Sequence, residues 1–472
     1  MLQGPPGTGK TDFIARAVIT LCRFFKKEAK RNLRVLITAN SHAAIENVLF
    51  MIDKKMGKCE DISLYKASRF DDGSKKPVGK VCIVNDYSLS DDTVYSHMRD
   101  DKEDRPIVMG STVWSCAKMK DAAGSEYFDL IIIDEASQVR VMDAMLALSM
   151  GRIGASRYLL VGDGDQLSAI IQGRYGKDSG AGYLYGSIFD FYKEQLSKND
   201  LMLCENFRMN EVLLRYSAEK IYGREYTSFS EEIAKRRLTY DSALSGAEDW
   251  LCYILDGFSN EEEDYWPLIF CSISGENPYD ENRAEVMMVT KLTEALRQTI
   301  ACPDDEAFWL GKDDKDGILG IVSPHHKHIE ALKDDISGNI HMNRDDLYIG
   351  TVDKLQGQQR EAVIVSYGVT DLERAVTEGE FIFNRNRLNV ALTRAKCKSI
   401  TIFSDILTKP SPEMLDTDDE DLQHGIEYVC GFHDFMQQNE ADTEIENKRF
   451  ELRCEGSGNV IVEIYKKRIK LK

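Results

Sequence analysis

The sequence lacks the long apolar runs of membrane proteins and the paired cysteines of small metal-binding domains. No stretch of its 472 residues approaches the roughly eighteen consecutive apolar residues that a membrane-spanning helix needs, and no signal segment opens the chain. Its eleven cysteines include no C-x-x-C pair, which argues against a zinc ribbon or an iron–sulfur framework. We therefore expect an intracellular protein of the cytoplasm or nucleus, with no membrane partner.

The chain also lacks an overall excess of positive charge, since its 79 acidic residues outnumber its 60 Lys and Arg. The formal net charge is -19, a balance that by itself disfavours a nucleic-acid partner, because basic surface carries phosphate binding. The distribution changes this conclusion, since residues 1–58 hold eleven Lys or Arg against four acids, a local net charge of +7. The acids gather elsewhere, for instance at residues 413–421. A partner that carries phosphates is therefore not excluded.

Short apolar runs alternate with helical patterns along the chain, which predicts α/β domains built on parallel sheets with helices on both faces. An acid-rich stretch near residues 259–264 separates two sets of these runs. The first set lies at 33–38, 107–110, 130–133 and 158–161, and the second at 268–271, 318–322, 348–352, 362–366 and 399–403. We expect a first domain over 1–225, a second over 226–408, and a C-terminal extension over 409–472.

Two segments lie outside this alternation. Residues 57–106 carry Gly, Lys, Asp and Ser clusters over a length greater than a plain connection, which predicts an inserted subdomain. The extension over residues 409–472 begins with an acidic linker and contains a hairpin candidate around Gly456 and Gly458. We interpret residues 462–466 of this hairpin as an ordinary edge strand.

Residues 4–11 read GPPGTGKT and fit the pattern G-x-x-x-x-G-K-[ST]. In this pattern, glycines let backbone N–H groups curve around phosphates at the N-terminus of a helix. The residues expected to bind the nucleotide are Gly4, Pro5, Pro6, Gly7, Thr8, Gly9, Lys10 and Thr11. A helix should follow, docked on the sheet through apolar residues at helical spacing, namely Phe13, Ile14, Ala17, Val18, Leu21 and Phe25.

Two further strands end in polar residues. The apolar run at 128–133 delivers Asp134 and Glu135 to the carboxyl edge of the sheet, where α/β sites form. One acid of such a pair can hold Mg²⁺, and the other can orient and deprotonate a water molecule. The strand at 158–161 leads into GDGDQL, which places the amide of Gln166 where it could sense a γ-phosphate. Taken alone, this last segment reads as a glycine-rich turn.

Together these motifs resemble the superfamily 1B helicases, in particular the Upf-like group, over residues 3–405. The segments QGPPGTGKT, DEAS and GDGDQL are similar to the phosphate loop, acidic box and third motif of that group. The segments NFRM at 206–209, TVDKLQG at 351–357 and NVALTRA at 389–395 resemble its arginine motif and its last two motifs. The resemblance is specific because many motifs occur in the same order.

The resemblance implies two tandem RecA-like domains that bind ATP and Mg²⁺ and move along single-stranded nucleic acid, 5′ to 3′. Lys10 would contact the phosphates, Thr11 and Asp134 would hold Mg²⁺, Glu135 would orient the water, and Gln166 would report the γ-phosphate. From the second domain, ATP contacts are expected from Gln356, Gly357 and Gln359.

Two arginines are the candidates for catalytic fingers. Phosphoryl transfer places charge on the γ-phosphate oxygens, and cations that complete the site stabilise that charge. Arg208 and Arg394 occupy the matching motif positions. The segments TANSH at 38–42 and GSTVW at 110–114 resemble motifs that grip a nucleic-acid backbone, with DNA slightly favoured over RNA as the partner. The expected nucleic-acid contacts are Thr38, Asn40, Ser41, Ser111, Thr112 and Thr351.

The chain departs from the group's pattern in several places. Gln359 stands where the group usually has an acid, and Ser168 follows GDGDQL where proline is common. Residues 323–328 read SPHHKH in place of a Tyr-Arg-x-Gln cluster, and the three histidines allow a metal site as an alternative to a helix start. The group also has a strand leading into the phosphate loop, and a β-barrel upstream. We expect neither here, which predicts a portion of a longer motor.

Two other functions remain open. A protein without its upstream region could bind nucleotide or nucleic acid without productive hydrolysis. Another phosphate-loop enzyme, such as a kinase or GTPase, would need a phosphoryl acceptor or guanine-reading motif, which we do not find in the sequence.

Overall fold

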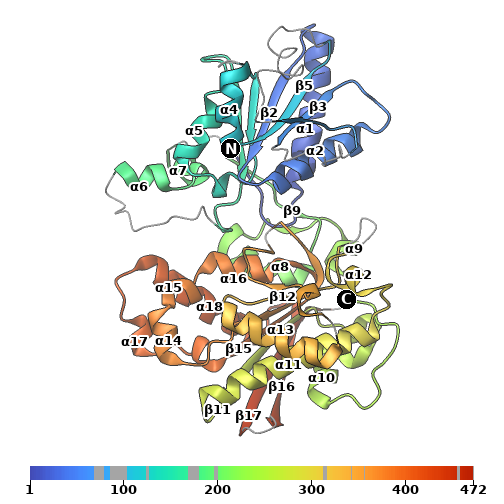
Figure 1. Ribbon diagram of the computed structural model, residues 1–472. Helices are drawn as coiled ribbons and strands as arrows, with labels where there is room; N and C mark the ends of the chain where they lie inside the picture. The colour runs from blue at the N-terminus through green and yellow to red at the C-terminus, as the bar shows by residue number, and fades with distance from the viewer. Residues whose placement is uncertain are drawn as a thin grey trace. The chain divides into compact units, whose positions relative to one another are not determined.

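The computed structural model describes residues 1–68, 79–85, 104–123, 127–167, 180–195, 200–311, 316–341, 343–355, 357–453 and 458–470. The chain divides into two compact units, Met1–Cys204 and Glu205–Lys472 (Figure 1). The division expected from the sequence was at residue 225. Residues 205–225 belong to unit 2 because their helix α8 (Glu211–Ser217) packs against strands of that unit.

Unit 1 is built on a parallel sheet in the order β4-β3-β5-β2-β6-β7-β1-β8. Neighbouring strands of this sheet pair in parallel, as the alternation of apolar runs and helices predicts. The strands are β1 (Leu2–Gln3), β2 (Arg34–Ala39), β3 (Ser63–Ser68), β4 (Cys82–Asn85), β5 (Ile107–Thr112), β6 (Leu130–Ile133), β7 (Arg157–Gly162) and β8 (Leu201–Met202). All four strands expected in this unit are confirmed.

Helices cover both faces of this sheet because its strands are apolar on both faces. Val35 and Ile37 of β2 pack with α1 (Lys10–Glu28) and α2 (His42–Met56), whereas Leu36 faces the opposite cluster. Figure 1 shows α1 and α2 on one face and the remaining helices on the other. These are α4 (Val113–Ala123), α5 (Val141–Leu148), α6 (Gly180–Tyr185) and α7 (Ile188–Gln195), with the short 3-10 helix η1 (Ala136–Gln138).

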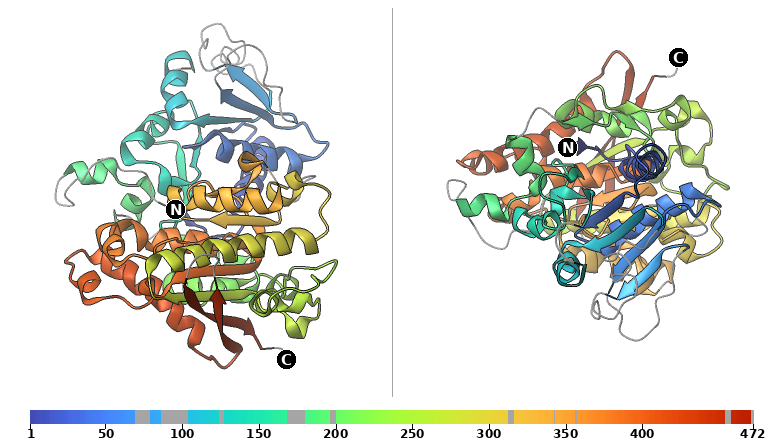
Figure 2. Two further views of the ribbon diagram at one scale, coloured as in Figure 1. Left: turned by 60° about the horizontal axis from the view of Figure 1, so that its bottom comes forward. Right: turned by 90° about the horizontal axis from the view of Figure 1, so that it is seen from above.

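The segment at residues 57–106, expected to form an inserted subdomain, contributes strands to the main sheet where it is described. β3 pairs with β5, from Ser63 opposite Ile107 to Lys66 opposite Gly110, and β4 pairs with β3. Both views of Figure 2 show these blue strands at one border of the sheet. Without β3, one edge of β5 would leave its backbone N–H and C=O groups unpaired. The added parallel strands satisfy these groups, which explains the arrangement.

Two expectations about the start of the chain are wrong. A strand does lead into the phosphate loop, because Leu2 and Gln3 form β1 between β7 and β8. The helix that follows buries Ile14, Ala15, Val18, Ile19 and Cys22, whereas Phe13 is 39% exposed and Leu21 is 36% exposed. The apolar stripe expected from the sequence included both faces of this helix, since Phe13 and Ile14 each fit helical spacing.

Unit 2 is built on a mixed sheet in the order β13-β12-β14-β15-β11-β17-β16. Five strands are parallel, and β17 pairs antiparallel with β11 and β16. They are β11 (Leu268–Gly275), β12 (Leu319–Val322), β13 (Ile349–Gly350), β14 (Arg360–Ser366), β15 (Ala395–Ser404), β16 (Thr443–Arg453) and β17 (Asn459–Ile469). The five parallel strands confirm the second predicted set. A separate pair joins β9 (Glu205–Asn206) and β10 (Thr227–Ser228).

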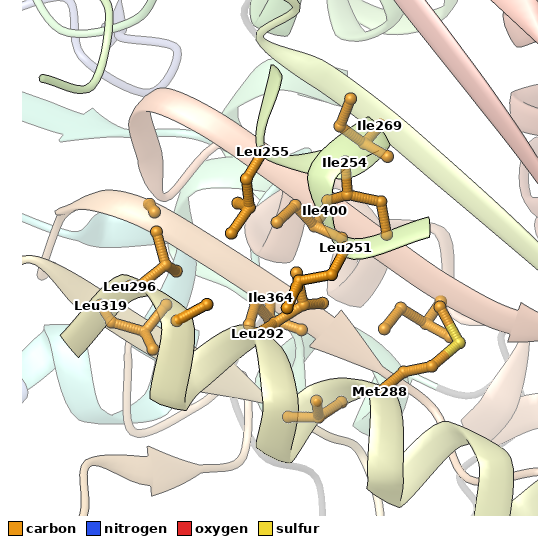
Figure 3. Close-up of a cluster of buried hydrophobic side chains, with 14 of the residues drawn as sticks. Leu251, Ile254, Leu255, Ile269, Met288, Leu292, Leu296, Leu319, Ile364 and Ile400 are labelled. Carbon is orange, nitrogen blue, oxygen red and sulfur yellow. The ribbon is translucent and has the colours of Figure 1, made fainter. Parts of the chain in front are cut away.

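One face of this sheet carries an extensive apolar core. Figure 3 shows Ile269, Ile364 and Ile400 from three strands in contact with Leu251 and Met288 from two helices. The longer helices on this face are α11 (Pro278–Thr299) and α13 (His326–Ile340), which run side by side in Figure 2. Shorter helices are α9 (Glu231–Ala234), α10 (Asp249–Ile254), α12 (Asp305–Trp309), η3 (Asp256–Phe258), η4 (Glu262–Asp264) and η5 (Arg344–Asp346).

The opposite face is lined with aromatic side chains. Phe270 of β11 contacts Phe403 of β15 and Phe432 of α18 (Glu420–Gln437). The helix α8 also packs on this face. Further helices of unit 2 are the π-helix η2 (Ala218–Tyr222), α14 (Leu372–Thr377), α15 (Gly379–Ile382), α16 (Arg385–Leu392), η6 (Asp405–Leu407) and α17 (Pro412–Leu415).

The C-terminal hairpin is part of the second sheet. β16 and β17 form the predicted hairpin, with Thr443 opposite Ile469 and Arg453 opposite Asn459. β17, interpreted as an edge strand, lies between β11 and β16, so this interpretation was wrong. Its pairing with β11 runs from Leu268 to Gly275, a contact between segments almost 200 residues apart that the local pattern does not encode. Among the described residues, no helix has the length and apolarity required to span a bilayer.

Candidate functional site

The phosphate loop of unit 1 is shaped by its glycines. Gly7 and Gly9 both have a φ of 77°, a backbone conformation that residues with a Cβ rarely adopt. Gly9 begins α1 without a side-chain cap, so the first N–H groups of the helix remain available to an anion. The loop is held by the Gly4 N–H, which donates to the Gly162 carbonyl at 2.9 Å, and by the Thr8 hydroxyl, which donates to the Pro5 carbonyl at 2.7 Å.

The side chain of Lys10 folds back over this loop. Its Nζ donates to the carbonyl oxygen of Gly4 at 2.6 Å. A Cβ on Gly4 would lie 2.3 Å from Cγ of Lys10, so only glycine leaves room for the lysine at this position. Thr11, the second residue of the helix, is half-buried beside it. The loop, the lysine and the hydroxyl therefore meet at the helix start.

The predicted acid pair lies at the same edge of the sheet. The N–H of Asp134 donates to the carbonyl of Thr38 at 2.8 Å, which extends the pairing of β6 with β2. Burial and the neighbouring Glu135 raise the pKa of Asp134 to about 7, and Lys10 acts in the opposite direction. Glu135 has a φ of 48°, a strained value for a residue with a side chain. Its Oε2 is buried and has no hydrogen-bond partner within the described part of the chain.

These carboxylates fit a divalent cation. Two adjacent acids at a buried strand end, one with a raised pKa and one with an unpartnered oxygen, are incompletely satisfied by the protein. Mg²⁺ prefers such oxygen ligands and keeps several of its waters. A cation here would favour the ionised carboxylates, which fits the predicted role of Asp134 and Thr11.

A third cluster follows β7, where Asp163 is central. Nε2 of Gln166 donates to Oδ2 of Asp163 at 2.8 Å, and Nε2 of Gln3 lies 3.5 Å from Oδ1 of Asp163 and 3.3 Å from Oδ2 of Asp165. Asp163 and Gln166 are both buried. Asp163 and Gln3 were not among the predicted site residues. The signal for both was their position directly after, or at the end of, neighbouring strands.

The residues expected to grip nucleic acid separate into two groups. The side chains of Thr38, Ser111 and Thr112 are buried, and Thr38 lies opposite Ser111 in the pairing of β2 with β5. Asn40 and Ser41 are exposed beyond the end of β2, and the hydroxyl of Ser41 accepts from the N–H of residue 44 and so caps α2. A nucleic-acid strand bound at this edge would therefore contact Asn40 and Ser41 directly. Thr38, Ser111 and Thr112 would act only through the protein backbone of β2 and β5.

In unit 2, Arg208 is held by acceptors of its own unit. Its Nε donates to Oε1 of Gln359 at 2.8 Å, and its Nη1 donates to the carbonyl of Thr393 at 3.1 Å. Gln359 in turn donates to Asp316 at 2.9 Å. Asn206 fixes the backbone, since its Oδ1 accepts from the N–H of Arg208 at 2.8 Å. The residue that replaces the group's usual acid thus positions the predicted finger.

Arg394 follows Thr393, so the structure brings both predicted arginine fingers to one region of unit 2. The side chain of Arg394 is buried, and its Nε donates to the carbonyl of Val390 at 3.0 Å. Gly357 has a φ of 79° in a turn, and Thr351 is half-buried after β13. Gln356, also predicted to bind ATP, lies outside the described residues.

Of the three histidines at 325–328, His325 and His328 are buried and make polar contacts, whereas His326 is exposed at the start of α13. Nε2 of His328 lies 2.7 Å from the hydroxyl of Ser366, which donates to Glu285 at 2.7 Å. Burial lowers the pKa of His328 to about 4 and raises that of Glu285 to about 7. His325 contacts Arg374 at 2.8 Å. No group of three or more His, Cys, Asp or Glu side chains among the described residues is placed to hold a metal ion.

The fold and the loop define the class of protein. A parallel α/β sheet with GPPGTGKT after one strand and an acid pair after another is a phosphate-loop nucleotide-binding unit. Comparison with known families agrees. One family model, described as an AAA domain, matches residues 1–90 and 93–174, and a second model of the same description matches residues 184–405.

Among curated proteins, the chain is 26% identical over 432 residues to the DNA replication ATP-dependent helicase/nuclease dna2 of Schizosaccharomyces pombe, covering 88% of this chain and 27% of that protein. It is 24% identical over 497 residues to the DNA polymerase alpha-associated DNA helicase A of the same organism, covering 96% and 66%. The chain belongs to the Upf-like group of superfamily 1 helicases. It spans only 27% and 66% of the length of these two relatives.

Proposed function

We propose that this chain is an ATP-driven motor that hydrolyses ATP to move along single-stranded nucleic acid, 5′ to 3′, and to separate duplexes. The observation that carries the proposal is the convergence of the phosphate loop, Lys10 and the pair Asp134 and Glu135 at one edge of unit 1. The two arginines of unit 2 support it, because they occupy the motif positions of the group. An intracellular location follows, where ATP and nucleic acids occur together.

In the proposed reaction, the loop N–H groups and Lys10 bind the β- and γ-phosphates of ATP. Thr11 and Asp134 would hold Mg²⁺, which would neutralise developing charge on the phosphates. Glu135 orients the attacking water and accepts its proton, a role for which its buried and unpartnered oxygen suits it. Gln166 reports the presence of the γ-phosphate.

The arginines of unit 2 supply the remaining positive charge. Arg208 must exchange its hydrogen bonds to Gln359 and Thr393 for phosphate oxygens, and Arg394 must leave a buried position. Such an exchange couples hydrolysis to a change in unit 2, as a motor requires. Gln356, Gly357 and Gln359 are the further residues that we propose for contacts with ATP.

We slightly favour DNA over RNA as the strand that is bound. One relative is described as a DNA helicase and another as a DNA replication ATP-dependent helicase/nuclease, whereas backbone grip and stacking alone do not distinguish DNA from RNA. The exposed Asn40 and Ser41 contact the strand, and Thr38, Ser111, Thr112 and Thr351 shape its path.

The test is steady-state ATP hydrolysis by the full chain without nucleic acid, with single-stranded DNA and with RNA of the same sequence. We expect stimulation by single strands, larger with DNA, and its loss in Lys10→Ala. Lys27→Ala is the matched control, because Lys27 lies on the same helix and its side chain is 83% exposed. Hydrolysis that no single strand stimulates would favour a protein that binds without productive turnover, and normal turnover in Lys10→Ala would refute the site.

A further inference from the structure

Trp114 differs from the other tryptophans of the chain. Of the four in the sequence, Trp250, Trp266 and Trp309 lie in unit 2 and are 3%, 8% and 1% exposed. Trp114 lies in unit 1 and is 56% exposed. An exposed aromatic ring leaves a flat apolar face on which a ligand can stack.

Its position is at the edge where the predicted nucleic-acid residues gather. Trp114 is the second residue of α4, which begins directly after β5. β5 pairs with β2 up to Ala39 opposite Thr112, so both strands end at this edge, and the exposed Asn40 and Ser41 follow β2. Side chains on a helix lean towards its N-terminus, which directs the ring of Trp114 towards the same edge.

The sequence of α4 presents a cation beside the ring. Val113, Cys116 and Met119 are buried and form the stripe that packs on the sheet. Trp114 and Lys118 are both exposed and lie one helical turn apart, a spacing at which side chains are neighbours. One exposed stripe of α4 (labelled in Figure 1) therefore offers an aromatic face followed by an ammonium group.

A single strand presents the complementary chemistry, a base next to a phosphate. We propose that Trp114 stacks on a base of single-stranded nucleic acid while Lys118 contacts the adjacent phosphate, forming one contact of the strand with unit 1. This inference rests on the proposed motor function and adds two residues to it. Stacking on an aromatic side chain tolerates any base, which suits a motor that moves along arbitrary sequences.

The first test uses the indole as its own reporter. Because the other three tryptophans are buried, a stacked base should quench the fluorescence of Trp114 in a saturable way when the full chain is titrated with oligothymidylate. Trp114→Phe keeps a ring for stacking and removes the reporter, so we expect binding with little quenching. Saturable binding that leaves the fluorescence of the wild-type chain unchanged would overturn the inference.

The second test separates the two residues by salt dependence. We expect Trp114→Ala to weaken binding of a labelled single strand about tenfold at every salt concentration, as loss of one stacked base does. Lys118→Gln should weaken binding and reduce the slope of log affinity against log salt by about 0.7, the value for one phosphate contact on a single strand. Phe24→Ala is the control, since Phe24 is also 56% exposed but lies on α1. This variant should bind the labelled single strand with wild-type affinity.

Thermal unfolding of each variant separates loss of contact from loss of fold. Substitutions of exposed side chains change stability by about 0.5 kcal/mol or less, so the midpoints should match. Normal affinity in Trp114→Ala would show that the ring serves another partner and would overturn this inference alone. Failure of the wild-type chain to bind any single strand would instead overturn the proposed function.

Discussion

The proposed phosphate-binding residues of unit 1 and the proposed arginine fingers of unit 2 are preorganised for their roles to different degrees. In unit 1 the loop is held by glycine conformations and backbone hydrogen bonds, and Oε2 of Glu135 has no hydrogen-bond partner among the described residues. In unit 2 the guanidinium of Arg208 is engaged by Gln359 and Thr393, and Arg394 is buried. The residues of unit 1 are preorganised, whereas the arginines of unit 2 must exchange contacts before they can act.

The two units also each bury a carboxyl group with a pKa near 7, but in different surroundings. Asp134 has a second acid beside it and feels the charge of Lys10. Glu285 accepts from the Ser366 hydroxyl and the Gly368 N–H, within the core of unit 2. A raised pKa alone therefore does not identify a functional carboxylate. The proposed role of Asp134 rests on its position at a strand end beside Lys10 as well.

The largest effect should come from removing the engaged arginine. We expect Arg208→Ala to lower strand-stimulated ATP hydrolysis about a thousandfold, the lower range for an arginine finger, with nucleotide binding retained. Steady-state hydrolysis and binding of a fluorescent ATP analogue measure the two quantities. Arg449→Ala is the control, because Arg449 is exposed on β16. Unchanged hydrolysis in Arg208→Ala would mean that its contacts to Gln359 and Thr393 are purely structural.

The next largest effect concerns Glu135 of unit 1, and it distinguishes a role in catalysis from a role in nucleotide binding. We expect Glu135→Gln to lower kcat about a hundredfold, since the amide cannot accept the proton of the water, while KM for ATP stays near its wild-type value. Steady-state kinetics at several ATP concentrations separate kcat from KM. Glu194→Gln on the exposed part of α7 should behave like wild type. A raised KM with normal kcat would assign Glu135 to binding instead.

The third prediction concerns Glu285, the buried carboxyl group of unit 2. Burial raises the pKa of Glu285 to about 7 from 4.5, so between these values the folded state binds more protons than the unfolded state, and stability falls as pH rises. Glu285→Gln removes this dependence. Its free energy of unfolding relative to wild type should improve by about 2 kcal/mol from pH 5 to pH 8.

Denaturant unfolding at both pH values measures this difference. The comparison cancels the opposite contribution of His325, whose pKa, lowered to about 4, reduces stability as the pH falls below 6.5. Parallel pH profiles for the two proteins would mean that Glu285 is already ionised in the folded state.

The smallest effect tests the space that glycine leaves for Lys10. A Cβ on residue 4 would lie 2.3 Å from Cγ of Lys10, so Gly4→Ala should displace the lysine and raise KM for ATP about tenfold. Gly338→Ala is the control, because its Cβ meets no atom within 4 Å and α13 gains helix propensity. A normal KM in Gly4→Ala would show that the lysine accommodates the methyl group by moving.

Much of the fold followed from the sequence. The apolar runs predicted the strands that lead to Asp134 and Gln166, because a buried parallel strand is a short continuous apolar segment. The strand β1 that leads into the phosphate loop was not predicted. The helix α1 was also predicted, but its buried face was partly wrong. Consecutive apolar residues such as Phe13 and Ile14 fit two faces equally, and only packing decides between them.

Other features depended on contacts between distant segments. The strands β3 and β4 lie in a stretch whose composition resembles a separate insertion, yet they extend the main sheet. The strand β17 resembles an edge strand, yet it lies between β11 and β16. Nothing in the local pattern of either segment specifies its neighbour, since strand pairing depends on edges formed by other parts of the chain.

The sequence by itself determined the order of the motifs and hence the class of chemistry, because the phosphate loop, the acid pair and the arginine motifs are local segments. Tertiary structure alone decided how available each residue is. It placed Arg208 in unit 2 against Gln359, buried Arg394 and left Trp114 exposed beside the end of β5. The physical reason is that burial and partners arise from packing between distant segments, which local residue patterns do not record.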